Sequence, residues 1–224
     1  MWHAYNDQET CLAQLVDKVS TLLVQAVDRK GSAGLAVSGG KSPIPLFERL
    51  SRVDLPWKNI HITLVDERFV STADPDSNEY LVRKHLLTNR AGQARFTGLV
   101  ADPDDLAHCM ERANGQAIDI AVAILGMGDD GHTASLFPNA PQLSQALDMR
   151  GSQRYIHVSP PEAPHERISM TLPALLNAGH LLLAIAGEHK RRVFEQAAKQ
   201  ATSDMPISYF ITQTGVPFDA YWHP

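Results

Sequence analysis

The chain has 224 residues, of which 44% are hydrophobic and 20% charged, values that are ordinary for a globular protein with a sizeable core. Its net charge of -5 gives no electrostatic footprint for nucleic acid, so any anionic ligand must be held by local cations. No apolar run is long enough to span a membrane, and Met1 to Thr10 lacks the cations of a signal peptide, so we expect a cytoplasmic protein without a membrane partner.

The pattern of apolar residues alternates between helical and strand spacing along the whole chain. In chain order we expect a helix near residues 8–28, a strand at 34–37, a helix through 45–50, a strand at 60–65, helices at 80–87 and 104–112, strands at 118–125, 154–158 and 181–186, a helix at 188–200 and a short strand at 216–222. There is no internal repeat and no long linker. The pattern therefore predicts one α/β domain over residues 1–224, built on a mostly parallel sheet.

Cys11 and Cys109 fall in predicted amphipathic helices and have no metal-ligand spacing. We expect both to be buried apolar residues rather than partners in a disulfide.

The segment from Gly126 to Pro138 directly follows the apolar predicted strand at 118–125 and contains Asp129, Asp130 and His132. We expect a tight loop leading into a helix, with these polar side chains at the carboxyl end of a central strand, where open α/β sheets bind ligands. Histidine titrates near neutral pH, so His132 can take a proton from water and return it to a leaving group. A metal site is not expected, because the third ligand that such a site needs is missing.

A glycine loop, Ser38-Gly39-Gly40-Lys41-Ser42-Pro43, lies between a predicted strand and a predicted helix. Glycines let backbone N–H groups approach an anion, and a following helix N-terminus favours negative charge. Its spacing matches neither a Walker loop nor a dinucleotide-binding loop, and taken alone it is equally compatible with an ordinary turn.

Cations occur at or after three other predicted strands. Asp66-Glu67-Arg68 ends one strand, Arg167 opens the segment Arg167-Ile168-Ser169-Met170-Thr171, and Lys190 follows the strand at 181–186. Arginine and lysine suit phosphate oxygens, although each cluster by itself could be a solvated rim.

Taken together, these segments resemble the 6-phosphogluconolactonase family within the glucosamine-6-phosphate isomerase/lactonase superfamily. The resemblance covers nearly the whole chain, in order, and its most specific part is Gly126 to Pro138. One departure is Lys41-Ser42, where the family more often has threonine before the proline; serine keeps the hydroxyl.

The resemblance implies a Rossmann-like sheet with helices on both faces, a cytoplasmic monomer, and metal- and cofactor-free hydrolysis of 6-phospho-D-glucono-1,5-lactone. It suggests His132 and Asp130 as the catalytic pair and Gly128 and Gly131 as backbone donors. The expected substrate-binding residues are Ser38, Gly39, Gly40, Lys41, Ser42, Asp66, Arg68, Gly128, Arg167 and Lys190. Which cation meets the phosphate and which meets the developing oxyanion stays open at this point.

Two alternatives differ from a lactonase in their expected residues. A glucosamine-6-phosphate deaminase of the same superfamily carries a glutamate where this chain has Phe137, and a tyrosine where it has Arg68. A non-catalytic sugar-phosphate sensor carries an added helix-turn-helix, for which residues 1–30 supply no basic recognition element. Both comparisons favour the lactonase.

Overall fold

A computed structural model describes residues 1–224 and contains a seven-stranded sheet in which every neighbouring pair is parallel. The strand order across the sheet is β1 (Trp2–Ala4), β10 (Phe218–His223), β9 (Leu181–Ala186), β6 (Ile120–Leu125), β2 (Ala33–Val37), β3 (Ile60–Leu64) and β5 (Arg95–Thr97). This confirms the predicted α/β class with its parallel sheet. The short strands β1 and β5 had no clear pattern in the sequence.

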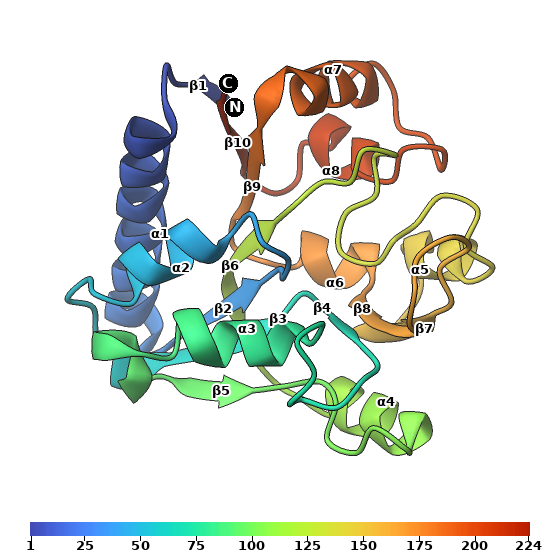
Figure 1. The fold of residues 1–224 in the computed structure, drawn as a ribbon, viewed down its shortest axis with the longest axis horizontal. Helices are drawn as coiled ribbons and strands as arrows, with labels where there is room; N and C mark the ends of the chain where they lie inside the picture. Colours follow the sequence, from blue (N-terminus) through green and yellow to red (C-terminus); the bar gives the residue numbers. More distant parts are fainter.

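Helices cover both faces of this sheet, with α1 and α2 on one side and α6, α7 and α8 on the other (Figure 1). The helices are α1 (Gln8–Lys30), α2 (Ile44–Leu50), α3 (Asn78–His85), α4 (Leu106–Asn114), α5 (Leu143–Leu147), α6 (Leu172–Leu176), α7 (Gly187–Ala197) and α8 (Ser208–Thr212), with short 3-10 turns at Trp57–Asn59 and Asn89–Gln93. The five longer predicted helices are therefore confirmed within a few residues.

Helix α1 shows how local chemistry sets these bounds. The Asp7 side chain accepts a hydrogen bond from the Thr10 backbone N–H at 2.7 Å and caps the first turn. Gly31 ends the helix in the left-handed region, with φ of 77°. One stripe of the helix, containing Cys11, Leu15 and Val19, is buried against the sheet.

The core is one cluster of 54 buried residues, centred on strands such as β2, which is buried at all five positions. Parallel strands covered on both faces need such continuous apolar sequence.

Both cysteines are buried and free, as predicted. None of the helices combines the length and apolar character that crossing a membrane would require.

A second, three-stranded antiparallel sheet was not predicted. It consists of β4 (Asp66–Arg68), β8 (Arg167–Met170) and β7 (Tyr155–Val158). The predicted strand at 154–158 therefore exists but lies outside the main sheet. The Asp66-Glu67-Arg68 segment is a strand in its own right rather than the end of β3.

The prediction that the loop after β6 leads directly into a helix was wrong. Residues 126–142 form turns, and the next helix, α5, begins only at Leu143. Gly131, Ala134 and Asn139 have φ values of 79°, 51° and 61°, which no right-handed helix can contain. Pro138 adds a position without a backbone donor.

Candidate active site

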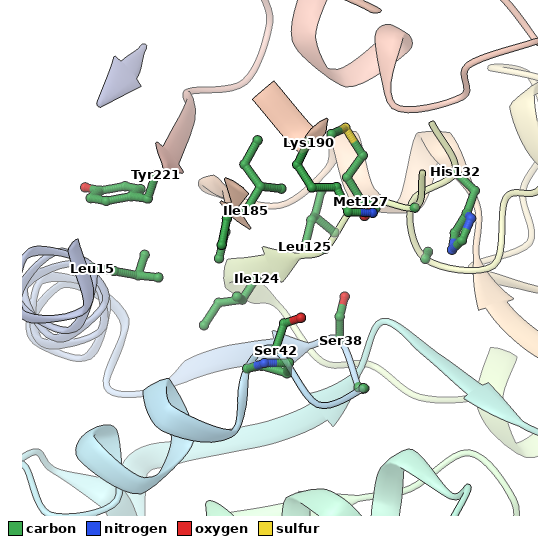
Figure 2. A pocket seen from close by; sticks show the side chains of 18 of the residues that line it. Leu15, Ser38, Ser42, Ile124, Leu125, Met127, His132, Ile185, Lys190 and Tyr221 are labelled. Atoms are coloured by element: carbon green, nitrogen blue, oxygen red, sulfur yellow. The ribbon is translucent and has the colours of Figure 1, made fainter. Parts of the chain in front are cut away.

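A cavity of about 340 Å³ opens at the carboxyl ends of β2, β6, β9 and β10, bounded on one side by α1. Figure 2 shows Ser38 and Ser42 on one wall, Lys190 on the opposite wall, His132 at one end, and Leu15 with Tyr221 at the other. The predicted site residues that line it are Ser38, Gly39, Gly40, Ser42, Asp66, Arg68, Gly128, His132 and Lys190. The strand-end location expected from the sequence is thus the one observed.

His132 and Asp130 form a hydrogen-bonded pair at one end of this cavity. His132 Nδ1 lies 2.6 Å from Asp130 Oδ1, and the His132 backbone N–H donates to the same oxygen at 3.0 Å. Burial raises the pKa of Asp130, but these hydrogen bonds outweigh it and hold the pKa below its usual value. Since an ionised carboxylate only accepts, Nδ1 carries the proton and Nε2 is left as the basic nitrogen of the neutral ring.

Gly128 provides the space in which this pair sits. A Cβ on residue 128 would lie 2.1 Å from His132 Nδ1 and 2.4 Å from Asp130 Oδ1. The expectation that Gly128 and Gly131 present free backbone donors to the substrate was wrong. The Gly128 N–H donates to the His132 carbonyl at 2.8 Å, and the Gly131 N–H donates to the Gly128 carbonyl at 3.2 Å. Both groups are used to close the loop itself.

Phe137 lies against the imidazole of His132, with ring centroids 4.3 Å apart. Its side chain has no proton to give, so this position packs the histidine and does not take part in proton transfer. The contact explains what the residue does where a deaminase would carry a glutamate.

Lys190, in the first turn of α7, is tied to the His132 loop by two contacts. Its Nζ donates to the Met127 carbonyl at 2.6 Å and lies 2.8 Å from Asp129 Oδ1. The hydrogen bond from Lys190 lowers the pKa of Asp129, so this carboxylate is charged at neutral pH. One of the three ammonium protons remains for a ligand in the cavity.

The glycine loop opposite Lys190 has unused donors. Within the protein, no hydrogen bond is made by the backbone N–H of Gly39, Gly40 or Lys41. The buried Oγ of Ser38 also has no partner. Gly40 has a φ of 90°, which only glycine adopts readily. An anion-binding loop needs such unpaired N–H groups, and binding of an anion here stays a prediction.

Arg68 and Arg167 are direct cross-strand neighbours in the second sheet. Arg68 lines the cavity, and its guanidinium donates to the Asp76 carbonyl. Arg167 is only 5% exposed, and its Nη1 is buried without a hydrogen-bond partner. Burial lowers the pKa of Arg167, and the charge of Arg68 lowers it further. Arg167 does not itself line the cavity.

Two further predicted residues lie apart from the cavity surface. Lys41 points to solvent at the outside of the glycine loop. Asp130 does not line the cavity and reaches it only through His132.

Several site residues were missed in the sequence although they lie inside the segments that drew attention. Ser135 donates from Oγ to Asp66 Oδ2 at 2.6 Å and fixes that carboxylate. The Glu67 carboxylate, 1% exposed, accepts from the backbone N–H groups of Asn78 and Glu79 and so anchors α3. Burial raises the pKa of Glu67 to about 7, against the opposing effect of these backbone hydrogen bonds. In the sequence, the only signal for Ser135 and Glu67 was that each lies within a segment already identified as part of a candidate site.

The Asn78 side chain completes the floor of the site. Its Nδ2 donates to the Asp66 carbonyl at 2.8 Å, and a Cβ on residue 39 would lie 1.8 Å from its Oδ1. Residue 39 must therefore be glycine for a steric reason that the sequence could not reveal.

No group of three or more histidine, cysteine, aspartate or glutamate side chains in residues 1–224 is arranged to hold a metal ion.

Comparison with known proteins identifies the family to which the chain belongs. A family model described as glucosamine-6-phosphate isomerases/6-phosphogluconolactonase matches residues 6–221. The chain belongs to this family. It is 45% identical to a 6-phosphogluconolactonase of Neisseria meningitidis, over 96% of both chains, and 39% identical to one of Pseudomonas putida, over 99% of this chain and 92% of the relative.

Solved structures of the family superimpose closely. A 6-phosphogluconolactonase of Shewanella baltica gives a TM-score of 0.93 at 36% identity, covering 100% of this chain and 97% of that one. A monomeric glucosamine-6-phosphate deaminase gives 0.80 at 18% identity, covering 99% of this chain and 96% of that one. Because the fold is shared by both activities, Phe137 and Arg68 in the cavity region, rather than the fold, separate the two alternatives.

Proposed function

We propose that this protein hydrolyses 6-phospho-D-glucono-1,5-lactone to 6-phosphogluconate, the second step of the oxidative pentose phosphate pathway. The observation that carries the proposal is the His132–Asp130 pair at the end of a strand-end cavity whose walls carry Lys190 and the glycine loop. The full-length similarity to 6-phosphogluconolactonases supports it. The whole chain, residues 1–224, is proposed to act as one catalytic domain, as a cytoplasmic monomer without metal or cofactor.

The reaction needs one water molecule and one residue that moves protons. His132 Nε2 takes a proton from water as its oxygen forms a bond to C1 of the lactone. The bond between C1 and the ring oxygen then breaks, and the imidazolium returns the proton to that oxygen, which becomes the C5 hydroxyl. The carboxylic acid formed at C1 loses its own proton to solvent at neutral pH.

Asp130 contributes by holding the ring and by stabilising its charged form. The 2.6 Å contact fixes the Nδ1 proton and directs Nε2 away from the carboxylate. A neighbouring carboxylate also favours the imidazolium that forms during attack, as in the serine hydrolase triad.

The phosphate is proposed to lie between Lys190 and the Ser38–Ser42 loop, with Arg68 beside it. Ser38 and Ser42 of this loop and Lys190 lie on opposite walls of the same cavity (Figure 2), and the loop has backbone N–H groups without partners in the protein. Such charge-assisted bonds are what a protein of net charge -5 needs to hold a dianion.

The proposal is tested with purified protein and freshly prepared lactone, by acid release in a pH-stat corrected for spontaneous hydrolysis. We expect His132→Ala to lower kcat by roughly 10²–10⁴-fold with little change in KM. His85→Ala is the matched control, because His85 pairs with Glu48 away from the cavity. Near-normal kcat in a folded His132→Ala protein removes this residue from the mechanism.

The phosphate assignment has its own test in the binding of 6-phosphogluconate. We expect Arg68→Ala and Lys190→Ala each to weaken binding by about 1.5–3 kcal/mol, the value of a hydrogen bond to a charged group, and Arg167→Ala, which removes a side chain that does not line the cavity, to weaken it less. The loss should be far smaller for unphosphorylated gluconolactone. Equal losses for both ligands would place these cations at the lactone carbonyl instead.

A further inference from the structure

Asp129 is an acidic residue that does not line the cavity but contacts Lys190, a cation of the cavity wall where an anion is expected to bind. Its side chain is 72% exposed, while that of Lys190 is 25% exposed, and the two charges are 2.8 Å apart. Hydrolysis gives Asp129 no evident task, since the proton transfer belongs to His132 and Asp130. The position of Lys190 is also supported independently by the Met127 carbonyl at 2.6 Å.

The geometry brings Asp129 close to any phosphate that binds the same ammonium group. A phosphate oxygen on the third proton of Lys190 would lie about 2.8 Å from Nζ. It would therefore stand roughly 5 Å from the carboxylate of Asp129, with which it shares the sign of its charge.

Resting on the proposed function, we propose that Asp129 is a positioning residue that weakens phosphate binding at Lys190. It holds the ammonium beside the cavity and partly neutralises it. Lactone and product both carry the phosphate, so both are held less tightly than the cavity would otherwise hold them. The residue thereby limits retention of the product, which leaves with its phosphate still attached.

The size of the effect follows from Coulomb's law. Two unit charges about 5 Å apart in a water-like medium repel enough to change a dissociation constant by about fourfold. A phosphate monoester carries about 1.5 to 2 negative charges near neutral pH, so removal of the Asp129 charge should tighten binding about tenfold at low ionic strength. At about 1 M salt the screening length is only about 3 Å, and the gain should shrink to less than about twofold.

The test compares wild type with Asp129→Asn, which keeps an oxygen for Lys190 but removes the charge. Titration calorimetry with 6-phosphogluconate and with inorganic phosphate, at low and at high salt, measures the affinity without any need for turnover. We expect a gain of about tenfold at low salt for 6-phosphogluconate, a parallel fall in KM for the phosphorylated lactone, and an unchanged KM for gluconolactone. Asp129→Glu should return affinity toward the wild-type value.

Asp148→Asn is the matched control, because Asp148 pairs with Arg150 outside the cavity and the variant makes the same change in net charge. Unchanged or weaker binding in Asp129→Asn, or an equal gain in Asp148→Asn, would overturn the inference. If Asp129→Asn tightens phosphate binding while wild type fails to turn over the lactone, the inference stands and the proposed reaction fails. The two ideas are thus judged separately.

Discussion

Replacing Gly128 with alanine should abolish most activity while leaving the fold intact. The new Cβ would lie 2.1 Å from His132 Nδ1, 2.3 Å from Cε1 and 2.4 Å from Asp130 Oδ1, where ordinary contacts begin at 3.4 Å. The imidazole of His132 and the carboxylate of Asp130 must therefore move by about 1 Å or more, which displaces the pair joined by the 2.6 Å hydrogen bond. A misplacement of about 1 Å costs a reaction about 10²-fold, so we expect kcat to fall at least that far.

The fold should survive because the clash falls on side chains that can rotate into the cavity. Gly128 also has an ordinary negative φ, since it is absent from the glycines in the left-handed region. We expect the melting temperature to change by no more than about 3 °C, which corresponds to about 1 kcal/mol for a chain of this size. Circular dichroism on the same preparation measures this change.

Gly115→Ala is the matched control at a glycine that does not line the cavity. A Cβ at residue 115 comes no closer than 3.4 Å to its nearest neighbour, the Glu111 carbonyl oxygen, and φ at this residue is -75°. Acid release from fresh lactone should therefore proceed within about twofold of the wild-type rate. A Gly128→Ala enzyme of near-normal kcat, or equal losses in the two variants, would show that the His132–Asp130 contact does not set the rate.

Three other predictions concern stability and metal dependence. Glu67→Ala should lower the free energy of unfolding by about 3 kcal/mol in urea titration, because the buried backbone N–H groups of α3 lose their acceptor. The control, Glu48→Ala on the surface, should change this free energy by less than about 0.5 kcal/mol. Burial lowers the pKa of His180 despite its bond to Asp219, so the unfolded chain takes up this proton first as pH falls through 6.5. The free energy of unfolding should therefore decline below that pH, and less steeply in His180→Asn; equal slopes would refute the assignment. Activity should survive prolonged dialysis against EDTA or dipicolinate, and a loss restored by zinc or manganese would contradict the proposed chemistry.

The sequence alone determined the elements whose signals are local. Helix α1 follows from apolar residues at helical spacing, and β2 and β6 follow from continuous apolar runs. The loop with Asp130 and His132 could be placed at a strand end because parallel α/β sheets put such loops on one edge.

Only the tertiary structure decided which distant groups meet. Lys190 contacts Met127 and Asp129 because β6 and β9 are neighbours in the sheet, an order that no local pattern encodes. Arg68 lies opposite Arg167 because β4 and β8 pair in an antiparallel register. These two residues are 99 positions apart in the sequence, so no local pattern could reveal the pairing. Helical and strand periods report which side of an element is buried, but the partner across a sheet depends on the whole chain's arrangement. For that reason the sequence named most of the residues of this site, while the space at Gly128, the contact between Lys190 and Asp129 and the burial of Arg167 became visible only in three dimensions.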